Sequence, residues 1–352
     1  MNSIYRFFIV YFLILSLYSK SQTYQITGGP LKLSGWDVSY NAESLNDYIK
    51  LTSDERHLVG ALFLLPDLKG YLPNIKLCNK WKAQFNFEIT GKGSSTHGFG
   101  DGFAFWHMVG LPREGEFVYD LGLTEASYGL IIGFDTYNDI EKKPMNKIHI
   151  LYGENIGNLE LNENAYHSPD FTDVFNLLGV SQKFVEIYGE KDPSDERNWI
   201  IRIDINGQTL VNQVISPSGK AKTMTAGSFG LSASTKDATA KHIVKNIKIY
   251  VERVSILTEK IFVKNLCPNP ETAETNVDLT VYNNKIVLDP TLYDFTYYKE
   301  NDSEPIINPQ NYLLENENEI VRVVISDVEN KLCSRESFIY LNTKKLIEEI
   351  LY

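Results

Sequence analysis

Residues 129–139 read Gly129-Leu-Ile-Ile-Gly-Phe-Asp-Thr-Tyr-Asn-Asp139, an almost wholly apolar run that ends in a group of polar residues. A short apolar run bounded by turn residues is typical of a strand that is buried on both faces. Segments 82–90 and 198–205, on either side of it in the chain, alternate polar and apolar residues with the period of a half-buried strand. We therefore expect a central strand that lies among more exposed ones.

Further short strands are expected along the same part of the chain. Asn206-Gly207 follows one strand directly, and this pair is a strong signal for a tight hairpin. No long helical period appears between residues 80 and 250. A chain with many strands and few helices indicates an all-β sandwich, and the remaining expected strands of this region are 103–107, 208–215, 229–234 and 242–251.

The texture of the sequence changes near residue 255. Cys267-Pro-Asn-Pro270 interrupts the chain, and four short strands separated by Asn, Asp and Pro turns follow. We expect a second, small β-sandwich over 255–342, with a tail at 343–352. Its four expected strands are 277–282, 295–298, 319–326 and 337–341.

Length and charge narrow the class of protein. The 352 residues suit two domains, and 45 acidic against 34 basic residues argue against a nucleic-acid partner. Arg6 precedes an apolar stretch at 7–17, which predicts a signal peptide over 1–21, with an uncleaved anchor as the alternative. No later segment is apolar enough to span a membrane, so we expect a secreted or cell-surface protein with possible cell-surface partners.

Three cysteines are too few for a disulfide scaffold. Cys267 and Cys333 both fall in the C-terminal segment and are expected to pair in an oxidising compartment. Cys78 is then left over and is expected to be a small buried hydrophobe.

Three polar groups stand at the ends of expected strands. Asp101 lies in Gly100-Asp-Gly102, where its carboxylate can accept hydrogen bonds from sugar hydroxyls or can be an ordinary turn residue. Segment 135–139 holds carboxylate and amide oxygens that suit Ca²⁺, a hard cation, or form a polar turn. His167-Ser-Pro-Asp170 is the third group, and by itself it is more typical of a plain loop.

The order of these groups resembles that of the L-type lectins, both the legume lectins and the eukaryotic cargo-receptor branch. The similarity runs from about Trp36 to Val251, and it includes Phe85-Asn-Phe-Glu-Ile-Thr-Gly-Lys-Gly93 and Gly227-Ser-Phe-Gly-Leu-Ser-Ala-Ser234. The resemblance implies a concanavalin-A-like jelly-roll β-sandwich over 22–254, with Ca²⁺ beneath a site for glycans or polysaccharides.

The resemblance also implies roles for individual residues. Asp101, His167 and Asp237 are expected to contact the sugar. Asp135 and Asp170 are expected to ligate Ca²⁺ through their carboxylates, and Tyr137 through its carbonyl. The loop is one residue shorter than the family form, so either Asn138 or Asp139 would bridge metal and sugar.

Two further departures from the family pattern concern the metal and the pocket. Gly133 stands where the legume manganese site has Glu, and His149, which matches the histidine of that site, is expected to be structural. Lys236-Asp-Ala238 replaces the family's Gly-Asp-Leu, so Lys236 is expected to crowd the sugar site.

The C-terminal segment resembles the immunoglobulin-like repeats of surface adhesins of gliding bacteria. The residues that carry this resemblance are Val277-Asp-Leu-Thr-Val-Tyr-Asn283, Phe295-Thr-Tyr-Tyr298, Ile307-Asn-Pro-Gln-Asn-Tyr312 and Val321-Arg-Val-Val-Ile-Ser326.

Two other functions remain open. A glycoside hydrolase on this type of sandwich needs two facing carboxylates, usually on a strand that reads Glu-x-Asp-x-Glu, and no such strand is present in the sequence. We therefore expect no enzymatic activity. A structural adhesin that has lost sugar binding is the main alternative to a lectin, and Ca²⁺-dependent sugar binding distinguishes the two.

Overall fold

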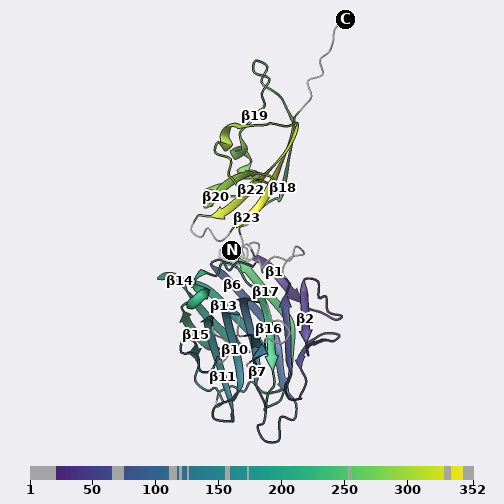
Figure 1. Cartoon of the computed structure of the whole chain (residues 1–352), viewed down its shortest axis with the longest axis vertical. Coiled ribbons are helices and arrows are strands. Elements are labelled where there is room, and N and C mark those ends of the chain that lie inside the picture. The colour runs from purple at the N-terminus through teal and green to yellow at the C-terminus, as the bar shows by residue number, and fades with distance from the viewer. Residues whose placement is uncertain are drawn as a thin grey trace, which may run out of the picture. The chain divides into compact units, whose positions relative to one another are not determined.

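The computed structural model describes residues 21–65, 75–110, 117–118, 121–124, 127–154, 159–172, 174–252, 254, 256–328 and 334–343. The chain forms two compact units, one over Thr23–Val251 and one that begins at Glu252 (Figure 1). The predicted signal peptide, apart from Ser21, and the tail after Thr343 lie outside the described residues.

The first unit is a sandwich of two antiparallel sheets, which confirms the predicted all-β fold (Figure 1). One sheet has eight strands in the order β15-β14-β13-β6-β17-β4-β3, with β1 paired to β17. These strands are β15 Gln208–Ile215, β14 Asp195–Ile205, β13 Gly179–Asp192, β6 Lys80–Thr90, β17 Lys241–Glu252, β4 Ile49–Thr52, β3 Glu43–Ser44 and β1 Ser21–Ile26.

The other sheet has seven strands in the order β12-β11-β10-β7-β16-β5-β2. They are β12 Tyr166–His167, β11 Lys143–Gly153, β10 Tyr128–Asn138, β7 Gly102–Val109, β16 Ser228–Ser234, β5 Val59–Leu64 and β2 Trp36–Tyr40. Shorter elements of this unit are β8 Phe117–Val118, β9 Leu123–Thr124 and the 3₁₀ turn η3 Gly219–Thr223.

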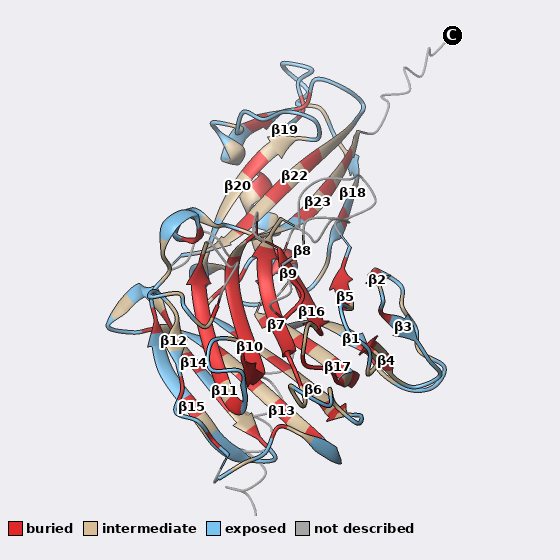
Figure 2. Cartoon of the chain, turned by 60° about the horizontal axis from the view of Figure 1, so that its bottom comes forward, coloured by how far each residue is buried: buried red, intermediate tan, exposed pale blue. Residues whose placement is uncertain are grey.

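Burial follows the sequence patterns. In β6 exposed or half-exposed and buried residues alternate, because one face of the eight-stranded sheet meets solvent. Strand β10 is buried at every residue after Tyr128, and Figure 2 shows β7, β10 and β16 buried along most of their length. The seven-stranded sheet is covered on its outer face as well, since Leu121 and Leu159 pack there against Trp106. The predicted central strand is therefore confirmed.

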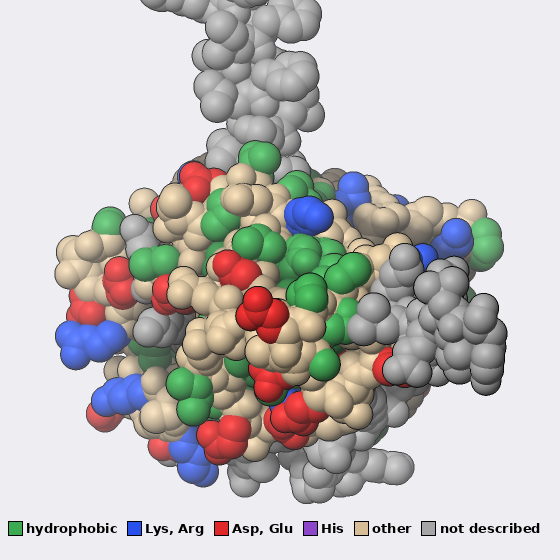
Figure 3. Space-filling model, turned by 90° about the horizontal axis from the view of Figure 1, so that it is seen from above, with side chains coloured by type: hydrophobic (Ala, Val, Ile, Leu, Met, Phe, Trp, Pro, Cys, Tyr) green, Lys and Arg blue, Asp and Glu red, His purple; other side chains and the backbone are tan. Residues whose placement is uncertain are grey.

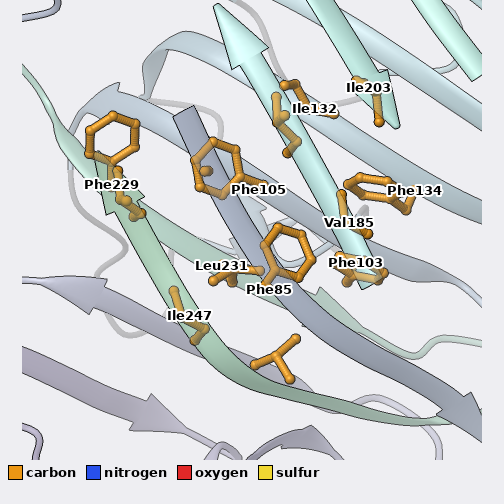
Figure 4. Close-up of a cluster of buried hydrophobic side chains, with 14 of the residues drawn as sticks. Phe85, Phe103, Phe105, Ile132, Phe134, Val185, Ile203, Phe229, Leu231 and Ile247 are labelled. Atoms are coloured by element: carbon orange, nitrogen blue, oxygen red, sulfur yellow. The ribbon is translucent and has the colours of Figure 1, made fainter. Parts of the chain in front are cut away.

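Aromatic side chains fill the space between the two sheets (Figure 4). The rings of Phe103 and Phe134 stack with centroids 4.6 Å apart, and Phe85 meets both rings edge-on. Each of these side chains is at most 1% exposed. Truncation of one such ring to alanine typically costs about 3–5 kcal/mol, so this core holds the strand ends that carry the polar groups.

The predicted hairpin at Asn206-Gly207 is confirmed. Asn206 and Gly207 have φ of 51° and 80°, the left-handed pair that a two-residue hairpin turn requires. The turn joins β14 to β15, and Ile205 pairs with Gln208 across it.

The second unit is also all β, with a four-stranded sheet in the order β18-β23-β22-β20 and a two-stranded sheet of β19 and β21. Strand β18 runs parallel to β23, and the other pairs are antiparallel. The strands are β18 Lys260–Leu266, β19 Asn276–Val277, β20 Tyr293–Lys299, β21 Tyr312–Leu313, β22 Asn318–Asp327 and β23 Ser334–Thr343. The helical turns are η4 Leu279–Tyr282, α2 Asn283–Ile286, η5 Pro290–Leu292 and η6 Pro309–Asn311.

The strand predicted at 277–282 is wrong. Only Val277 of that segment is a strand residue, and η4 follows at once. The Asp278 side chain accepts hydrogen bonds from the backbone N–H and the hydroxyl of Thr280, so it starts a helical turn. Strand β18 was not among the four predicted strands.

The predicted cysteine pairing is also wrong. Cys267 lies just after β18 and is a free, exposed thiol. Cys78 is buried and belongs to a disulfide, so it is not a mere small hydrophobe. Which cysteines approach one another depends on the tertiary fold, which their positions in the sequence do not reveal.

Figure 3, which views the molecule from above, shows hydrophobic, acidic and basic side chains intermingled on this face. Among the described residues, no helix is long and apolar enough to cross a membrane.

Candidate functional site

The ends of three neighbouring strands meet at Gly102. In the register of the seven-stranded sheet, Gly102 pairs with Asp135 of β10 on one side and with Ser234 of β16 on the other. The preceding residue, Asp101, is therefore held between the loops that follow β10 and β16. The Asp101 N–H donates to the Ser234 carbonyl at 3.1 Å, and the Asp101 carbonyl accepts a hydrogen bond from the Thr136 N–H at 2.9 Å.

The Asp101 peptide is tightly packed. Gly100 joins Asp101 through a cis peptide bond. A Cβ placed on Gly100 would lie 2.6 Å from Cβ of Tyr137 and 2.7 Å from Cβ of Ala238. The Asp101 side chain is 5% exposed, and its Oδ2 accepts a 3.2 Å hydrogen bond from the Ser234 hydroxyl. Glycine at position 100 is thus what allows the two flanking loops to close on this carboxylate.

Asp135 is a buried carboxylate at the end of β10. Its Oδ1 accepts a hydrogen bond of 3.0 Å from the Tyr137 N–H, and its Oδ2 lies 3.4 Å from Nε2 of His149. Burial raises the pKa of this carboxyl well above its usual range, and the nearby charges of Glu160 and Asp139 raise it further. A positive charge bound here would relieve both effects.

Tyr137 lies among three further carboxylates. Its hydroxyl is hydrogen-bonded to Nδ1 of His97 at 2.8 Å. Its pKa is raised by burial and then by the negative charges of Asp139, Asp237 and Asp101. The charges of Asp101, Asp139 and Asp237, which are predicted to contact the sugar, therefore all act on one tyrosine.

Asn138 and Asp139 differ in their surroundings. The Asn138 side chain is 7% exposed, and its Oδ1 accepts hydrogen bonds from the N–H groups of Ile140 and Glu141, at 2.9 and 2.5 Å. Asp139 is half-buried, and its side chain contacts Lys236 in the loop after β16. Asn138 therefore shapes the turn, and Asp139 is the better placed of the two to bridge a metal and a sugar.

Two ammonium groups contact Asp139. Nζ of Lys236 lies 3.3 Å from Oδ2, and Nζ of Lys142 lies 3.4 Å from Oδ1. Lys236 belongs to the loop after β16, so this ion pair links the loops that flank Asp101.

His167 belongs to a histidine pair. It faces His149 across β11 and β12, and the two Nδ1 atoms are 2.7 Å apart. Nε2 of His167 donates to the Asn162 carbonyl at 3.2 Å. Burial lowers the pKa of His149 to about 4, so the ring is neutral at pH 7. The histidine expected to be structural thus lies between Asp135 and His167.

Asp170 is exposed, and it is hydrogen-bonded both within its own loop and to the backbone of Asn146 in β11. Its Oδ1 accepts hydrogen bonds from the N–H and the hydroxyl of Thr172, at 2.8 and 2.5 Å. Within the described ranges, no group of three or more His, Cys, Asp and Glu side chains is arranged to hold a metal ion.

Sequence reasoning missed Glu160, His97 and Lys147. Glu160 accepts a hydrogen bond from the backbone of Asp139, and burial raises its pKa. Lys147 pairs with Asp135 across β10 and β11, and its charge acts on Asp135, Glu160 and Asp170. No local motif marks these three residues. For Lys147, the available signal was its place opposite Asp135 if the two neighbouring strands form an antiparallel pair.

The donor atoms of this region fit a hard cation in kind. Asp135, Asp139 and Glu160 present carboxylate oxygens whose negative charges act on one another, and Tyr137 adds a backbone carbonyl at the same strand end. Ca²⁺ prefers such oxygen ligands. Asp170 accepts hydrogen bonds from Thr172 and from the backbone of Asn146, the residue before Lys147 in β11.

The first unit is the part of the chain that matches known proteins. Residues 14–251 match the model of the legume-like lectin family. The vesicular integral-membrane protein VIP36 of Mus musculus is 26% identical over 227 residues, which cover 61% of this chain and 56% of VIP36. A VIP36-like protein of Bos taurus is 25% identical over 240 residues, which cover 66% of this chain and 63% of that protein. The match thus spans less than two thirds of these relatives.

The solved structures that are similar to this chain include domains of VIP36 and Emp47p. The exoplasmic/lumenal domain of VIP36, crystallised in a form with Ca²⁺ and Man3GlcNAc, aligns with a TM-score of 0.48 and 18% identity, over 65% of this chain and 89% of that domain. The carbohydrate recognition domain of Emp47p aligns with a TM-score of 0.47 and 12% identity, over 66% of this chain and 98% of that domain. Because the family model covers well over half of the sequence, this chain belongs to the legume-like lectin family.

Proposed function

We propose that this protein is a lectin that binds glycans at the strand ends around Asp101. The observation that carries the proposal is that hydrogen bonds with Ser234 and Thr136 hold Asp101 between the ends of β10 and β16, where the charges of Asp101, Asp139 and Asp237 all act on Tyr137. Carboxylates held in place accept hydrogen bonds from sugar hydroxyls without first losing conformational freedom. Membership of the legume-like lectin family supports the same function.

Ca²⁺ is the proposed cofactor. Asp135, Asp139 and the Tyr137 carbonyl would hold it, with Asp170 joining if its loop turns inward and Asn138 keeping the turn in shape. The ion would neutralise the repulsion among the buried carboxylates and fix the loop that presents Asp139. Calcium and mannose oligosaccharides appear in the crystal form of the related VIP36 domain, and glycans of this kind are the first to test here.

The place of action and the second unit are also part of the proposal. The charged and then apolar start of the sequence supports export, and so a secreted or cell-surface location. The second unit is proposed to be an Ig-like accessory module, since it is small and all β.

A glycan array tests the function. The purified protein is applied with Ca²⁺ and with a chelator, beside the Asp135→Ala variant. Binding of a defined set of glycans that is lost with chelator and in the variant supports the lectin and its metal. Silence of the folded protein across the array under every condition contradicts the proposal and favours a structural adhesin.

A further inference from the structure

The loop that carries Lys236 is anchored at both ends. The Thr235 N–H donates to the Leu58 carbonyl at 2.9 Å, and its hydroxyl donates to the Glu55 carbonyl at 2.6 Å. The Thr239 hydroxyl donates to Oδ1 of Asp54 at 2.8 Å. Both threonines are buried.

The tip of the loop is as well defined as its ends. The Lys236 N–H donates to the Ala238 carbonyl at 3.2 Å, and Ala238 is fully buried. Lys236 and Asp237 are the half-exposed residues between these anchors. Their side chains therefore project from a turn that is fixed by hydrogen bonds. Little backbone conformational freedom remains to be lost when a ligand binds.

The ion pair of Lys236 with Asp139 is partly open to solvent. The Lys236 side chain is 42% exposed and the Asp139 side chain 30% exposed, with the two charged groups 3.3 Å apart. An ion pair this exposed contributes little to stability, typically about 0–1 kcal/mol. Both partners thus keep hydrogen-bonding capacity that a ligand can use.

The carboxylates around Tyr137 supply one kind of partner only. The carboxylate groups of Asp101, Asp139 and Asp237 supply hydrogen-bond acceptors, whereas each sugar hydroxyl both donates and accepts. A site built from them alone would leave the lone pairs of the bound hydroxyls without donors, which is costly once water is excluded. The Lys236 ammonium has three N–H donors.

We infer that Lys236 is a sugar-binding residue, with Asp139 as the acceptor and Lys236 as the donor of one hydroxyl-binding pair for neutral sugars. This inference rests on the proposed lectin function and deepens it. It reverses the sequence-based expectation that Lys236 crowds the sugar site. The two hypotheses predict opposite effects on sugar affinity. Removal of the lysine weakens binding if Lys236 contacts the sugar, and it strengthens binding if Lys236 crowds the site.

The test compares variants of the full-length protein in saturating Ca²⁺. A panel of neutral mannose-, glucose- and galactose-terminated oligosaccharides is screened first, and the one that binds most tightly is titrated by calorimetry. We expect Lys236→Ala to raise Kd by about 10-fold or more, as loss of a charged hydrogen bond does. Lys236→Arg keeps the donors and should stay within about threefold of wild type.

Lys142→Ala is the matched control. It removes an ammonium group that contacts the other carboxylate oxygen of the same partner, Asp139. We expect it to change Kd less than about twofold. Unfolding temperatures of all variants should agree with wild type, because both lysines are half-exposed or more.

A rescue variant separates donation from general charge effects. Asparagine combines an acceptor and a donor in one side chain, and its carbonyl oxygen can still ligate Ca²⁺. In saturating Ca²⁺, Asp139→Asn combined with Lys236→Gly should therefore bind at least about 10-fold more tightly than Lys236→Gly alone. Equal or tighter binding by Lys236→Ala overturns the inference, with the lectin function intact. A wild-type protein that binds none of the panel, nor any glycan on the array, overturns the function and the inference together.

Discussion

Thr136 makes two hydrogen bonds to the carbonyl of Asp101, one from its N–H at 2.9 Å and one from its hydroxyl at 3.0 Å. Residues 35 positions apart in the sequence are thereby joined where β7 begins and β10 ends. The carboxylate that we propose to bind sugar is thus fixed to the strand whose end we propose to hold Ca²⁺. A change in the position of one loop is therefore expected to shift the other.

Asp135→Asn should separate stability from binding. Asparagine keeps the shape and still accepts the hydrogen bond from the Tyr137 N–H, but it removes a buried carboxyl whose pKa is raised by burial. We expect the free energy of unfolding at pH 7 to be unchanged or higher, and Ca²⁺-dependent glycan binding to be lost. Urea unfolding and glycan titration measure the two quantities.

Asp204→Asn is the control for that change, because Asp204 lies in β14 of the eight-stranded sheet, away from these loops. It should leave binding unchanged. A marked fall in stability of Asp135→Asn would mean that the charge at position 135 has a favourable partner in the folded protein, contrary to our account.

Gly100→Ala should weaken binding by pushing the loops apart. The new Cβ would lie within 2.7 Å of Cβ atoms of Tyr137 and Ala238, both fixed to the backbone. Overpacking of this kind costs about 1–3 kcal/mol in stability. Calorimetry and thermal unfolding check the two effects.

Ala238→Gly in addition removes one of the two obstructing atoms and should restore part of the binding. Unaltered binding by Gly100→Ala alone would show that the spacing of these loops does not matter for the site.

Stability should fall in mild acid because three histidines are buried. Burial lowers the pKa of His107 and His149 to about 4 and that of His242 to about 3. In the unfolded chain they titrate near 6.5 and bind more protons than in the folded state. Stability is therefore complete above about pH 6.5 and falls as the pH drops towards 4, by up to about 1.4 kcal/mol per pH unit for each histidine.

Urea unfolding at pH 7.5, 6.5 and 5.5 measures this dependence, and His242→Gln should reduce its slope. The raised pKa of Asp135 acts in the opposite direction, so the comparison of the two slopes is the test: a slope that His242→Gln leaves unchanged would be inconsistent with a neutral buried imidazole at position 242.

Much of the first unit could be predicted because its signals are local. The alternation at 82–90, the apolar run that ends at Asp135 and the Asn206-Gly207 turn each reflect the environment of single strands. The strands extend a few residues beyond their expected bounds, as β10 does to Asn138. The family resemblance then gave the order of the polar groups, and the family is confirmed.

The features that could not be predicted depend on strand register and on contacts between residues that are far apart in the sequence. Whether Asn138 or Asp139 faces the neighbouring loop follows from the turn that Asn138 caps. Glu160 and Lys147 come to Asp135 through strand pairing and a long loop, and the cysteine partners are set by the whole fold. The segment after Val277 has strand-like composition, yet the Asp278 cap turns it into helical turns.

The most direct test of the account is a titration of Asp101→Asn with the tightest-binding glycan of the array, beside wild type and Asp204→Asn. Asp101 is the carboxylate held between the two loops, and its amide counterpart keeps the size of the side chain. Our account expects Asp101→Asn to lose at least about 10-fold in affinity while Asp204→Asn binds as wild type does. Equal affinity of all three proteins would contradict it and would locate glycan binding away from these strand ends.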